Sequence, residues 1–229
     1  MPSPSTDTAG LSRRERERLM RRTAILDAAR EVFAEQGYGK ATLDEIAERA
    51  EFGKGTLYNY FDDGKEGILF AILDDLYDEI IALMQAHFRP DATSASSIRT
   101  AFREMAVAGF NYYEERRDLF FIVVKECNRM LFSDDPDRAR YIMEQYNRMV
   151  EVLLPVIEEA QEHGIVRSLP AEAIVHTLLG NLDGIMMHMT LEERWEDRDQ
   201  ADIMTPEQAA DFITSLLFDG LVGTVTPAT

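Results

Sequence analysis

The twelve residues AEFGKGTLYNYF, numbered 50–61, carry the densest group of side chains suited to recognising another molecule. They include two glycines, a lysine, a threonine, an asparagine and two tyrosines. A lysine can contact guanine or phosphate, an asparagine can pair with adenine, and a threonine methyl can pack on the methyl of thymine. The stretch fits three structures: a phosphate-binding loop, a piece of aromatic core, or a short helix that contacts a partner.

A second stretch of chemical interest is basic. Six arginines lie within ten positions, namely Arg13, Arg14, Arg16, Arg18, Arg21 and Arg22. The whole chain has a formal net charge of -18, which ordinarily disfavours an anionic partner. Residues 1–61, however, hold 10 Lys and Arg against 10 Asp and Glu, so the acidic surplus lies entirely in residues 62–229. The cluster therefore favours an anionic partner; the alternative is a solvated helix surface with Glu15 and Glu17 interleaved.

The sequence lacks the motifs of common enzyme classes. It has no Gly-x-Ser-x-Gly, P-loop, dinucleotide fingerprint or His-Glu-x-x-His, and GKGT at Gly53 has neither the preceding strand nor the glycine spacing of a phosphate loop. The single cysteine, Cys127, excludes an internal disulfide and suits a reducing cytoplasm. We expect no catalytic residue, no cofactor and no metal site, since metal-ligand spacing is missing among His87, His163, His176 and His188.

The spacing of apolar residues is helical along almost the whole chain, which predicts an all-α fold. A first helix is predicted over about residues 19–36 and ends at Gly37 in a left-handed cap. A second short helix begins at Thr42, which forms a capping box with Glu45. The inner face of the first helix is predicted to hold Ile25, Ala28, Ala29, Val32 and Phe33.

A third helix is predicted over about residues 54–60, with Leu57 and Phe61 one turn apart on its buried side. Two short helices after a longer one form a unit of the helix-turn-helix kind. In such a unit the third helix enters the major groove of DNA, and its N-terminal N–H groups face phosphate. Gly55 lets the backbone approach the duplex closely because it has no Cβ.

The stretch ILDAAREVFAEQGYGKATLDEIAERAEFGKGTLYNYF at residues 25–61, with KEGILFAIL after it, combines these features densely. It resembles the tetracycline-repressor (TetR/AcrR) family of transcriptional regulators. The distinctive parts are the Ala-Ala…Phe stripe, the Gly-Tyr turn, the Thr42 cap, the Lys-Gly-Thr-Leu-Tyr run and the Tyr-Phe ending. Further along the chain, the resemblance rests on length, helical content and EHGIVR at 162–167.

Two places differ from the family's usual sequence. Glu51 stands where the family usually has glycine, so a residue with a Cβ must make a tight turn. Gly53 stands where the family usually has serine, and it caps the third helix less well. The segment 62–64 is one residue longer than usual, so Lys65 stands one position later than the lysine that usually contacts phosphate in the family.

The resemblance implies a set of residues that contact DNA. Thr42 touches phosphate, Lys54 lies at the groove, and Thr56 reaches toward base edges. The alternative for Tyr58 and Tyr60 is packing against the first helix at its rim. The arginines between 13 and 22 follow the DNA backbone or enter a minor groove as a flexible arm. The whole implied set is Thr42, Lys54, Gly55, Thr56, Tyr58, Asn59, Tyr60 and Lys65.

A homodimer is expected, because one small helix-turn-helix buries too little surface for specificity and two can bind a palindrome. The resemblance places the interface in the last two helices, about 171–189 and 206–223. Gly180 and Gly184 permit close approach of helices there, and Pro206 begins the last helix. The alternative is that both helices are buried within one subunit.

About a hundred residues between these parts are rich in methionine and aromatic residues, which most often form core. The resemblance implies an apolar effector pocket in this region, and Pro155 should kink a helix over about 136–163 and help to open it. The effector is not identified: a cationic, drug-like molecule and a fatty acyl molecule both fit. The predicted pocket residues are Phe102, Met105, Phe110, Phe121, Met130, Tyr146 and Met149.

The sequence therefore predicts an all-α protein with a disordered basic tail (1–18), an N-terminal three-helix helix-turn-helix DNA-binding domain (19–64) and a larger helical ligand-binding and dimerisation domain (65–223). We expect a cytoplasmic, dimeric repressor that binds double-stranded DNA at a palindromic operator and responds to a small apolar effector. No membrane association is expected, since the longest weakly charged stretch is interrupted by Asn181 and Asp183. The alternatives are a helical small-molecule binding protein without DNA function and an all-α enzyme.

Overall fold

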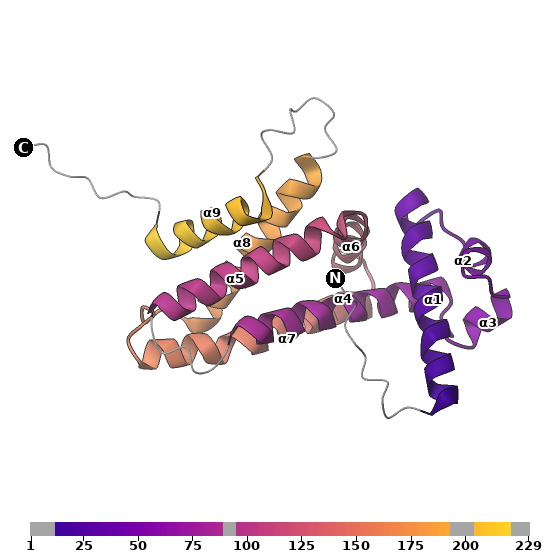
Figure 1. The fold of residues 1–229 in the computed structure, drawn as a ribbon, viewed down its shortest axis with the longest axis horizontal. Coiled ribbons are helices and arrows are strands. Elements are labelled where there is room, and N and C mark those ends of the chain that lie inside the picture. The colour runs from indigo at the N-terminus through magenta and orange to yellow at the C-terminus, as the bar shows by residue number, and fades with distance from the viewer. Residues whose placement is uncertain (1–11, 89–94, 193–203, 221–229) are drawn as a thin grey trace, which may run out of the picture. The chain divides into compact units, whose positions relative to one another are not determined.

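The computed structural model describes residues 12–88, 95–192 and 204–220. In these ranges all regular secondary structure is helical, which confirms the predicted fold class (Figure 1). The helices are α1 (Arg13–Gln36), α2 (Leu43–Arg49), α3 (Lys54–Tyr58), α4 (Lys65–His87), α5 (Ala95–Glu114), α6 (Arg117–Leu131), α7 (Pro136–Glu162), α8 (Ala171–Glu192) and α9 (Pro206–Asp219).

The chain forms two compact units. Unit 1 comprises the described residues up to Glu79 together with Asp118–Arg129, and unit 2 comprises Ile80–Arg117 and the described residues from Met130 onward. Unit 1 therefore includes α1–α3, the first part of α4 and most of α6. The functional boundary expected after residue 64 stays a prediction, because the compact unit itself continues to Glu79.

Helix α1 begins six residues earlier than the sequence analysis expected. Ser12 accepts a hydrogen bond from the Glu15 backbone N–H at 3.3 Å, and the Glu15 carboxylate accepts one from the Ser12 N–H at 2.8 Å. This capping box satisfies two N–H groups that the first turn leaves unpaired. Residues 13–18 are thus helical and do not belong to a disordered tail, Ser12 caps the helix, and residues 1–11 of the predicted tail lie outside the described residues.

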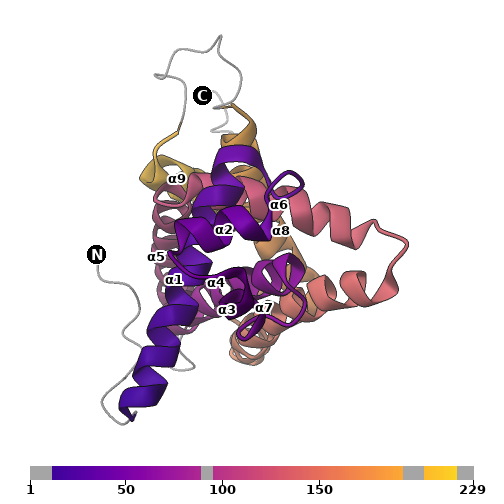
Figure 2. The same ribbon diagram turned by 90° about the vertical axis from the view of Figure 1, so that its right-hand side faces the viewer.

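The core of unit 1 is the predicted apolar stripe of α1 with partners from the next three helices. All five predicted inner residues of α1 are buried, from Ile25 to Phe33. The other helices contribute Ile46, Ala47, Leu57, Ile68, Leu69 and Ile72. Gly37 ends α1 with a positive φ of 80°, and its N–H donates to the Phe33 carbonyl at 2.8 Å. Figure 2 shows α2 and α3 beside α1.

Cys127 on α6 faces Tyr77 of α4 inside unit 1. Its Sγ lies 3.9 Å from the Tyr77 hydroxyl, and burial raises the pKa of the thiol to about 11. The thiol is therefore protonated at neutral pH, which suits a packing role.

Unit 2 pairs α5 with α9 and α7 with α8. Two ion pairs join α5 to α9: Arg99 donates to both carboxylate oxygens of Asp219 at 2.6 and 2.9 Å, and Arg103 contacts Asp211 at 2.5 Å. Helix α9 begins as predicted at Pro206, after a capping box of Thr205 and Gln208. Within the described ranges, every helix is too short or too polar to span a bilayer.

A substitution of Leu57 tests the packing of unit 1. Its side chain is 1% exposed, so Leu57→Ala should lower the free energy of unfolding by about 2–5 kcal/mol through lost burial and a cavity. Asn59, which is exposed and follows α3 directly, is the control: Asn59→Ala should change stability by about 0.5 kcal/mol or less. Denaturant titration followed by circular dichroism measures both, and equal effects would contradict the assignment of Leu57 to the core.

Candidate nucleic-acid interface and apolar cavity

The start of α2 is fixed by the predicted capping box. The Thr42 hydroxyl accepts from the Glu45 backbone N–H at 3.3 Å, and the Glu45 carboxylate accepts from the Thr42 N–H at 2.8 Å. The hydrogen bond from the Thr42 hydroxyl lowers the pKa of Glu45, so this carboxylate stays charged at neutral pH. The box thereby holds Thr42 on an exposed helix end.

The turn between α2 and α3 is made at Glu51, as the sequence analysis required. Glu51 has a φ of 58°, a left-handed conformation that costs a residue with a Cβ roughly 1 kcal/mol or more. The Phe52 N–H donates to the Ala47 carbonyl at 2.9 Å and closes the turn. Gly53 is the N-cap residue of α3 and offers the first turn no side-chain hydrogen bond.

Helix α3 divides its residues between core and surface. Leu57 and the following Phe61 are buried, while Lys54, Gly55, Tyr58 and Asn59 are exposed. Thr56 and Tyr60 are half-buried. The helix is two residues shorter than predicted and ends at Tyr58.

Tyr58 lies beside the longer connection that follows α3. A Cβ placed on Gly64 would come within 3.5 Å of the Tyr58 ring and 3.0 Å of Leu43. Gly64 also has a φ of 60°, so both the space and the backbone favour glycine there. Tyr58 is nevertheless 44% exposed, which leaves a large part of the ring accessible.

Lys54 is joined across the turn to Asp44 on α2. Its Nζ lies 3.0 Å from Asp44 Oδ2, and this hydrogen bond raises the pKa of Lys54. Both side chains are well exposed, so the pair contributes little stability. Any anion that binds the Lys54 ammonium must therefore compete with Asp44.

Lys65 makes contacts that sequence reasoning did not foresee. Its ammonium donates to the backbone carbonyls of Tyr38 and Ala41, both at 2.8 Å, and lies 4.5 Å from the centre of the Tyr38 ring. These contacts tie the connection between α1 and α2 to the start of α4. A phosphate contact by Lys65 stays a prediction, and this structure gives the residue an internal role.

Arg49 is a second residue that the sequence analysis missed. Its guanidinium lies 3.0 Å from Glu31 and 2.8 Å from Glu35, which joins the end of α2 to α1. The hydrogen bonds that Arg49 donates to Glu35 and Glu31 raise its pKa. In the sequence these three charges are 14 and 18 residues apart, so only the fold brings them together.

The six arginines of the basic cluster fall into two groups. Arg22 lies 3.5 Å from Asp75, which Arg30 also contacts, and Arg13 pairs with Glu17 one turn away. In the described part of the chain no ion pair involves the exposed side chains of Arg14, Arg16, Arg18 and Arg21. These four guanidinium groups are available to an anion, and they lie on a helix instead of a flexible arm.

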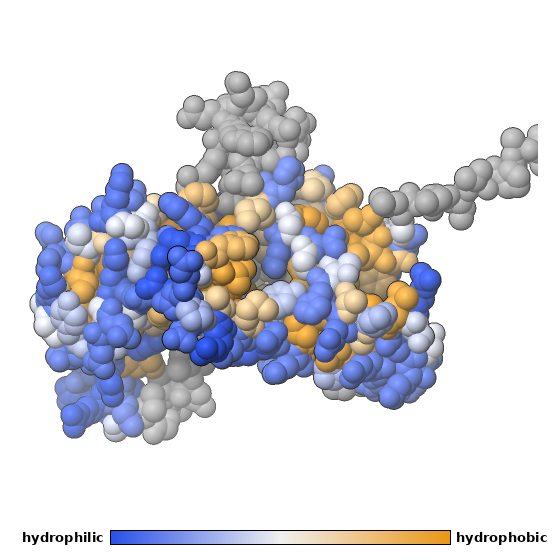
Figure 3. All heavy atoms as spheres, turned by 180° about the vertical axis from the view of Figure 1, so that it is seen from behind, coloured by the Kyte–Doolittle hydropathy of each residue, from blue (hydrophilic) through white to orange (hydrophobic). Residues whose placement is uncertain are grey.

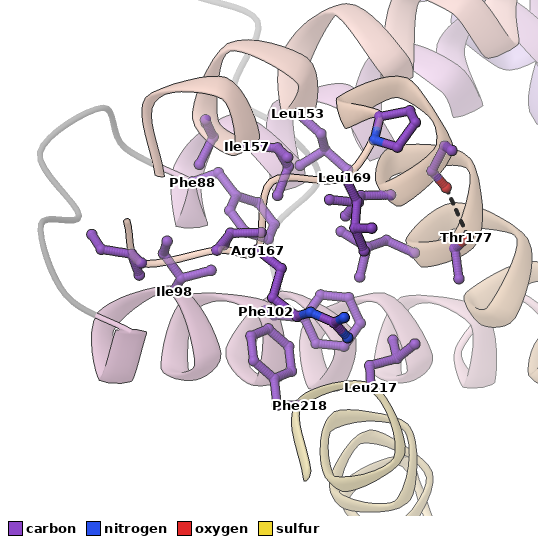
Figure 4. A pocket seen from close by; sticks show the side chains of 17 residues that line it. Phe88, Ile98, Phe102, Leu153, Ile157, Arg167, Leu169, Thr177, Leu217 and Phe218 are labelled. Atoms are coloured by element: carbon purple, nitrogen blue, oxygen red, sulfur yellow. Dashed lines mark hydrogen bonds between the residues drawn. The ribbon is translucent and has the colours of Figure 1, made fainter. Parts of the chain in front are cut away.

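Unit 2 contains an apolar cavity of about 600 Å³ (Figure 4). Of the predicted pocket residues, only Phe102 lines it. Met105, Phe110, Met130 and Met149 are buried core, Phe121 is half-buried in unit 1, and Tyr146 stacks on His176 with a 3.0 Å hydrogen bond. Most of the methionine and aromatic residues in the predicted set therefore form packed core. The cavity lies elsewhere in unit 2, where α5, α7, α8 and α9 approach the 165–170 turn.

Residues 25–72 match the family model described as "Bacterial regulatory proteins, tetR family". The chain belongs to the TetR family. This matched range contains the exposed α3, its turn and the Lys65 contact. The chain is therefore a helix-turn-helix transcriptional regulator that binds DNA, in a family of proteins that are not enzymes.

Two known regulators and one solved structure are similar to this chain over most of its length. The HTH-type transcriptional repressor KstR2 of Rhodococcus jostii is 26% identical over 167 residues, covering 73% of this chain and 74% of the relative. The HTH-type transcriptional regulator SrpR of Pseudomonas putida is 28% identical over 187 residues, covering 80% and 79%. FadR from Bacillus subtilis, solved with stearoyl-CoA, shares the fold, with a TM-score of 0.71 at 21% identity over 87% of this chain and 99% of that one.

The Lys54–Asp44 pair yields a prediction about DNA affinity. Asp44→Asn releases Lys54 and should strengthen binding about two- to five-fold, the range expected for an exposed ion pair. Asp62→Asn is the matched control, because it removes the same charge from an exposed position nearby that pairs with no cation in the described ranges. Fluorescence anisotropy with a labelled duplex measures both, and equal gains would show that only overall charge matters.

Proposed function

We propose that this TetR-family protein is a dimeric repressor that binds a palindromic operator and responds to a small apolar effector. The observation that carries the proposal is the way burial divides the residues of α3. Leu57 is its one buried residue and anchors the helix, while Lys54, Gly55 and Tyr58 are exposed to solvent. A helix that is anchored on one side and polar on the other is suited to the major groove. Such a regulator acts where the DNA is, in the cytoplasm.

The proposed DNA contacts combine α3 with the ends of neighbouring helices. Lys54 and Asn59 offer base or phosphate contacts, and Thr56 offers a methyl group to thymine. Nothing lies within 4 Å of the position a Cβ would take on Gly55, so the duplex can approach the backbone there. The remaining proposed contacts are Thr42, Tyr58, Tyr60 and Lys65, with the unpaired guanidinium groups of α1 as backbone contacts.

The proposed dimer interface uses α8 and α9. Nothing lies within 4 Å of the Cβ positions of Gly180 and Gly184, which leaves room for a second helix. On α9, Phe212 is 50% exposed and Phe218 is 37% exposed. Apolar side chains gather on the surface of unit 2 beside the end of α9, coloured orange in Figure 3. A second copy that covers this surface supplies the second helix-turn-helix that a palindrome requires.

The proposed effector site is the apolar cavity of unit 2. Its volume of about 600 Å³ falls in the range of small-molecule sites, roughly 300–1,000 Å³. The stearoyl-CoA in the B. subtilis FadR structure shows that one protein of this fold holds a ligand with a long apolar chain. Selection of bound duplexes from random DNA, with and without candidate effectors, tests operator and response together. Selected sequences without an inverted repeat would contradict the palindromic operator.

Phosphate neutralisation by Lys54 has a quantitative signature. Lys54→Ala should weaken binding and make the slope of log affinity against log salt less negative by about 0.9 for each subunit. Lys125→Ala, at an exposed position of α6, should leave the slope unchanged. Affinity measured at several salt concentrations gives both slopes; an unchanged slope in Lys54→Ala would remove Lys54 from the proposed site.

The dimer interface gives a separate prediction. Phe212→Asp places a charge in the proposed apolar contact and should weaken dimerisation about ten-fold or more. Phe132→Asp is the control, since Phe132 is 81% exposed and lies outside the proposed interface. Sedimentation equilibrium distinguishes the variants. A Phe212→Asp protein as dimeric as the control would place the interface elsewhere.

A further inference from the structure

The described wall of the unit 2 cavity carries a single charge. Seventeen residues of the described ranges line it, and among them Arg167 alone is charged. The polar side chain in the lining, Thr177, donates to the Ala173 carbonyl at 2.7 Å and is thus already engaged. The rest is aliphatic or aromatic, including Phe88, Leu153 and Leu178. The cavity therefore offers an apolar volume and one positive group.

Arg167 is free to bind a ligand. Within the described ranges its guanidinium makes no ion pair or hydrogen bond, and Figure 4 shows the side chain extending from the turn toward Phe102 on α5. By contrast, nearby Arg99 is neutralised by both oxygens of Asp219. An unpaired guanidinium beside apolar surface is suited to a carboxylate or phosphate, which it can bind through two parallel hydrogen bonds.

The backbone that carries Arg167 is fixed from α7. Gln161 donates through its Nε2 to the carbonyls of Arg167 and Leu169, at 2.8 and 2.7 Å. This holds the turn at the rim of the cavity. Helix α8 begins at Ala171, next to the lining residues Pro170 and Ala173, and its N-terminus adds a partial positive charge on the same side.

The acidic residues that give the chain its negative charge are missing from the described lining of this cavity. The net charge is -18, yet no aspartate or glutamate is among the lining residues that the structure describes. A cationic ligand would meet an unpaired arginine with no compensating acid. The charge of the lining thus separates the two effector types that the sequence left open, and it favours an anion.

We propose that this cavity binds an amphipathic molecule with an anionic head, the acyl chain lying among the apolar residues and the head on Arg167. The inference rests on the proposed effector role of the same cavity. Two sources share this chemistry: a free long-chain carboxylate and an acyl thioester of a phosphorylated carrier. In both, the guanidinium contacts anionic oxygen and the chain replaces water in the apolar volume.

A second cavity of about 510 Å³ provides the competing position for the head. It shares Phe88 and Val156 with the first cavity and is lined by Arg148, Glu151 and Gln85, with Pro155 in its wall. It holds one charge of each sign, so it offers an anion less than the first cavity does. Arg148 is also engaged with Gln145 at 2.6 Å.

Isothermal titration calorimetry of the full chain with four probes of one chain length tests the proposal. The probes are dodecanoate, dodecanol, dodecyltrimethylammonium and dodecanoyl-coenzyme A, all below their micelle concentrations. We expect dodecanoate or its thioester to bind about ten-fold more tightly than the alcohol, because a charge-assisted hydrogen bond at a partly exposed site contributes about that much affinity. We expect the ammonium compound to bind most weakly of the four. Whichever of the two anions binds more tightly identifies the source.

Three variants locate the head and the chain. Arg167→Leu should abolish the preference for an anion over dodecanol, and Arg167→Lys should keep part of it. Arg148→Leu, in the second cavity, should leave the preference intact. Ala173→Trp fills the cavity from an exposed position and should weaken all probes alike.

The proposal is overturned if none of the probes binds, if the ammonium binds as tightly as the carboxylate, or if Arg148→Leu and not Arg167→Leu abolishes the preference. These measurements contain no DNA. Failure of the regulatory role would instead appear as anion binding that depends on Arg167 but leaves operator affinity unchanged.

Discussion

Helix α3 contains five residues, fewer than an isolated helix needs to be stable in water. Its position therefore depends on burial of Leu57, with Phe61 just after it. Burial of those two side chains therefore positions every proposed base contact in this unit. The Arg49 bridge to α1 and the Lys65 bonds to the Tyr38 and Ala41 carbonyls hold the surrounding frame. The polar surface is thus positioned by apolar burial beneath it and by charges that do not themselves face DNA.

Short-range features of the fold were predictable from sequence. The Thr42–Glu45 box, the end of α1 at Gly37, the inner stripe of α1 and the Pro206 start of α9 all depend on residues within one or two turns. The early start of α1 was predictable too, because Ser12 and Glu15 have capping-box spacing, but the arginines around them favoured a tail instead. Local chemistry, where it was recognised, determined these helix ends.

Long-range geometry could not be obtained in the same way. No local pattern indicates that Lys65 reaches two carbonyls more than twenty residues earlier in the chain. Likewise, methionine and aromatic residues at helical spacing do not distinguish a packed core from a cavity wall. Phe102 lines the cavity and Phe110 on the same helix does not, although both are buried and the sequence treats them alike. The free volume arises where four helices and a turn meet, and that meeting is a property of the fold.

Helix α9 contributes to two surfaces. Leu217 and Phe218 line the cavity, Arg99 clamps Asp219 beside them, and the same helix presents Phe212 outward. If α9 forms the contact between two copies, the cavity wall and the subunit contact are opposite sides of one rigid element. Filling the cavity and associating two chains then become linked equilibria. The apparent affinity for an effector would vary with the concentration of the protein itself, so the sensitivity of the regulator would depend on how much of it the cell makes.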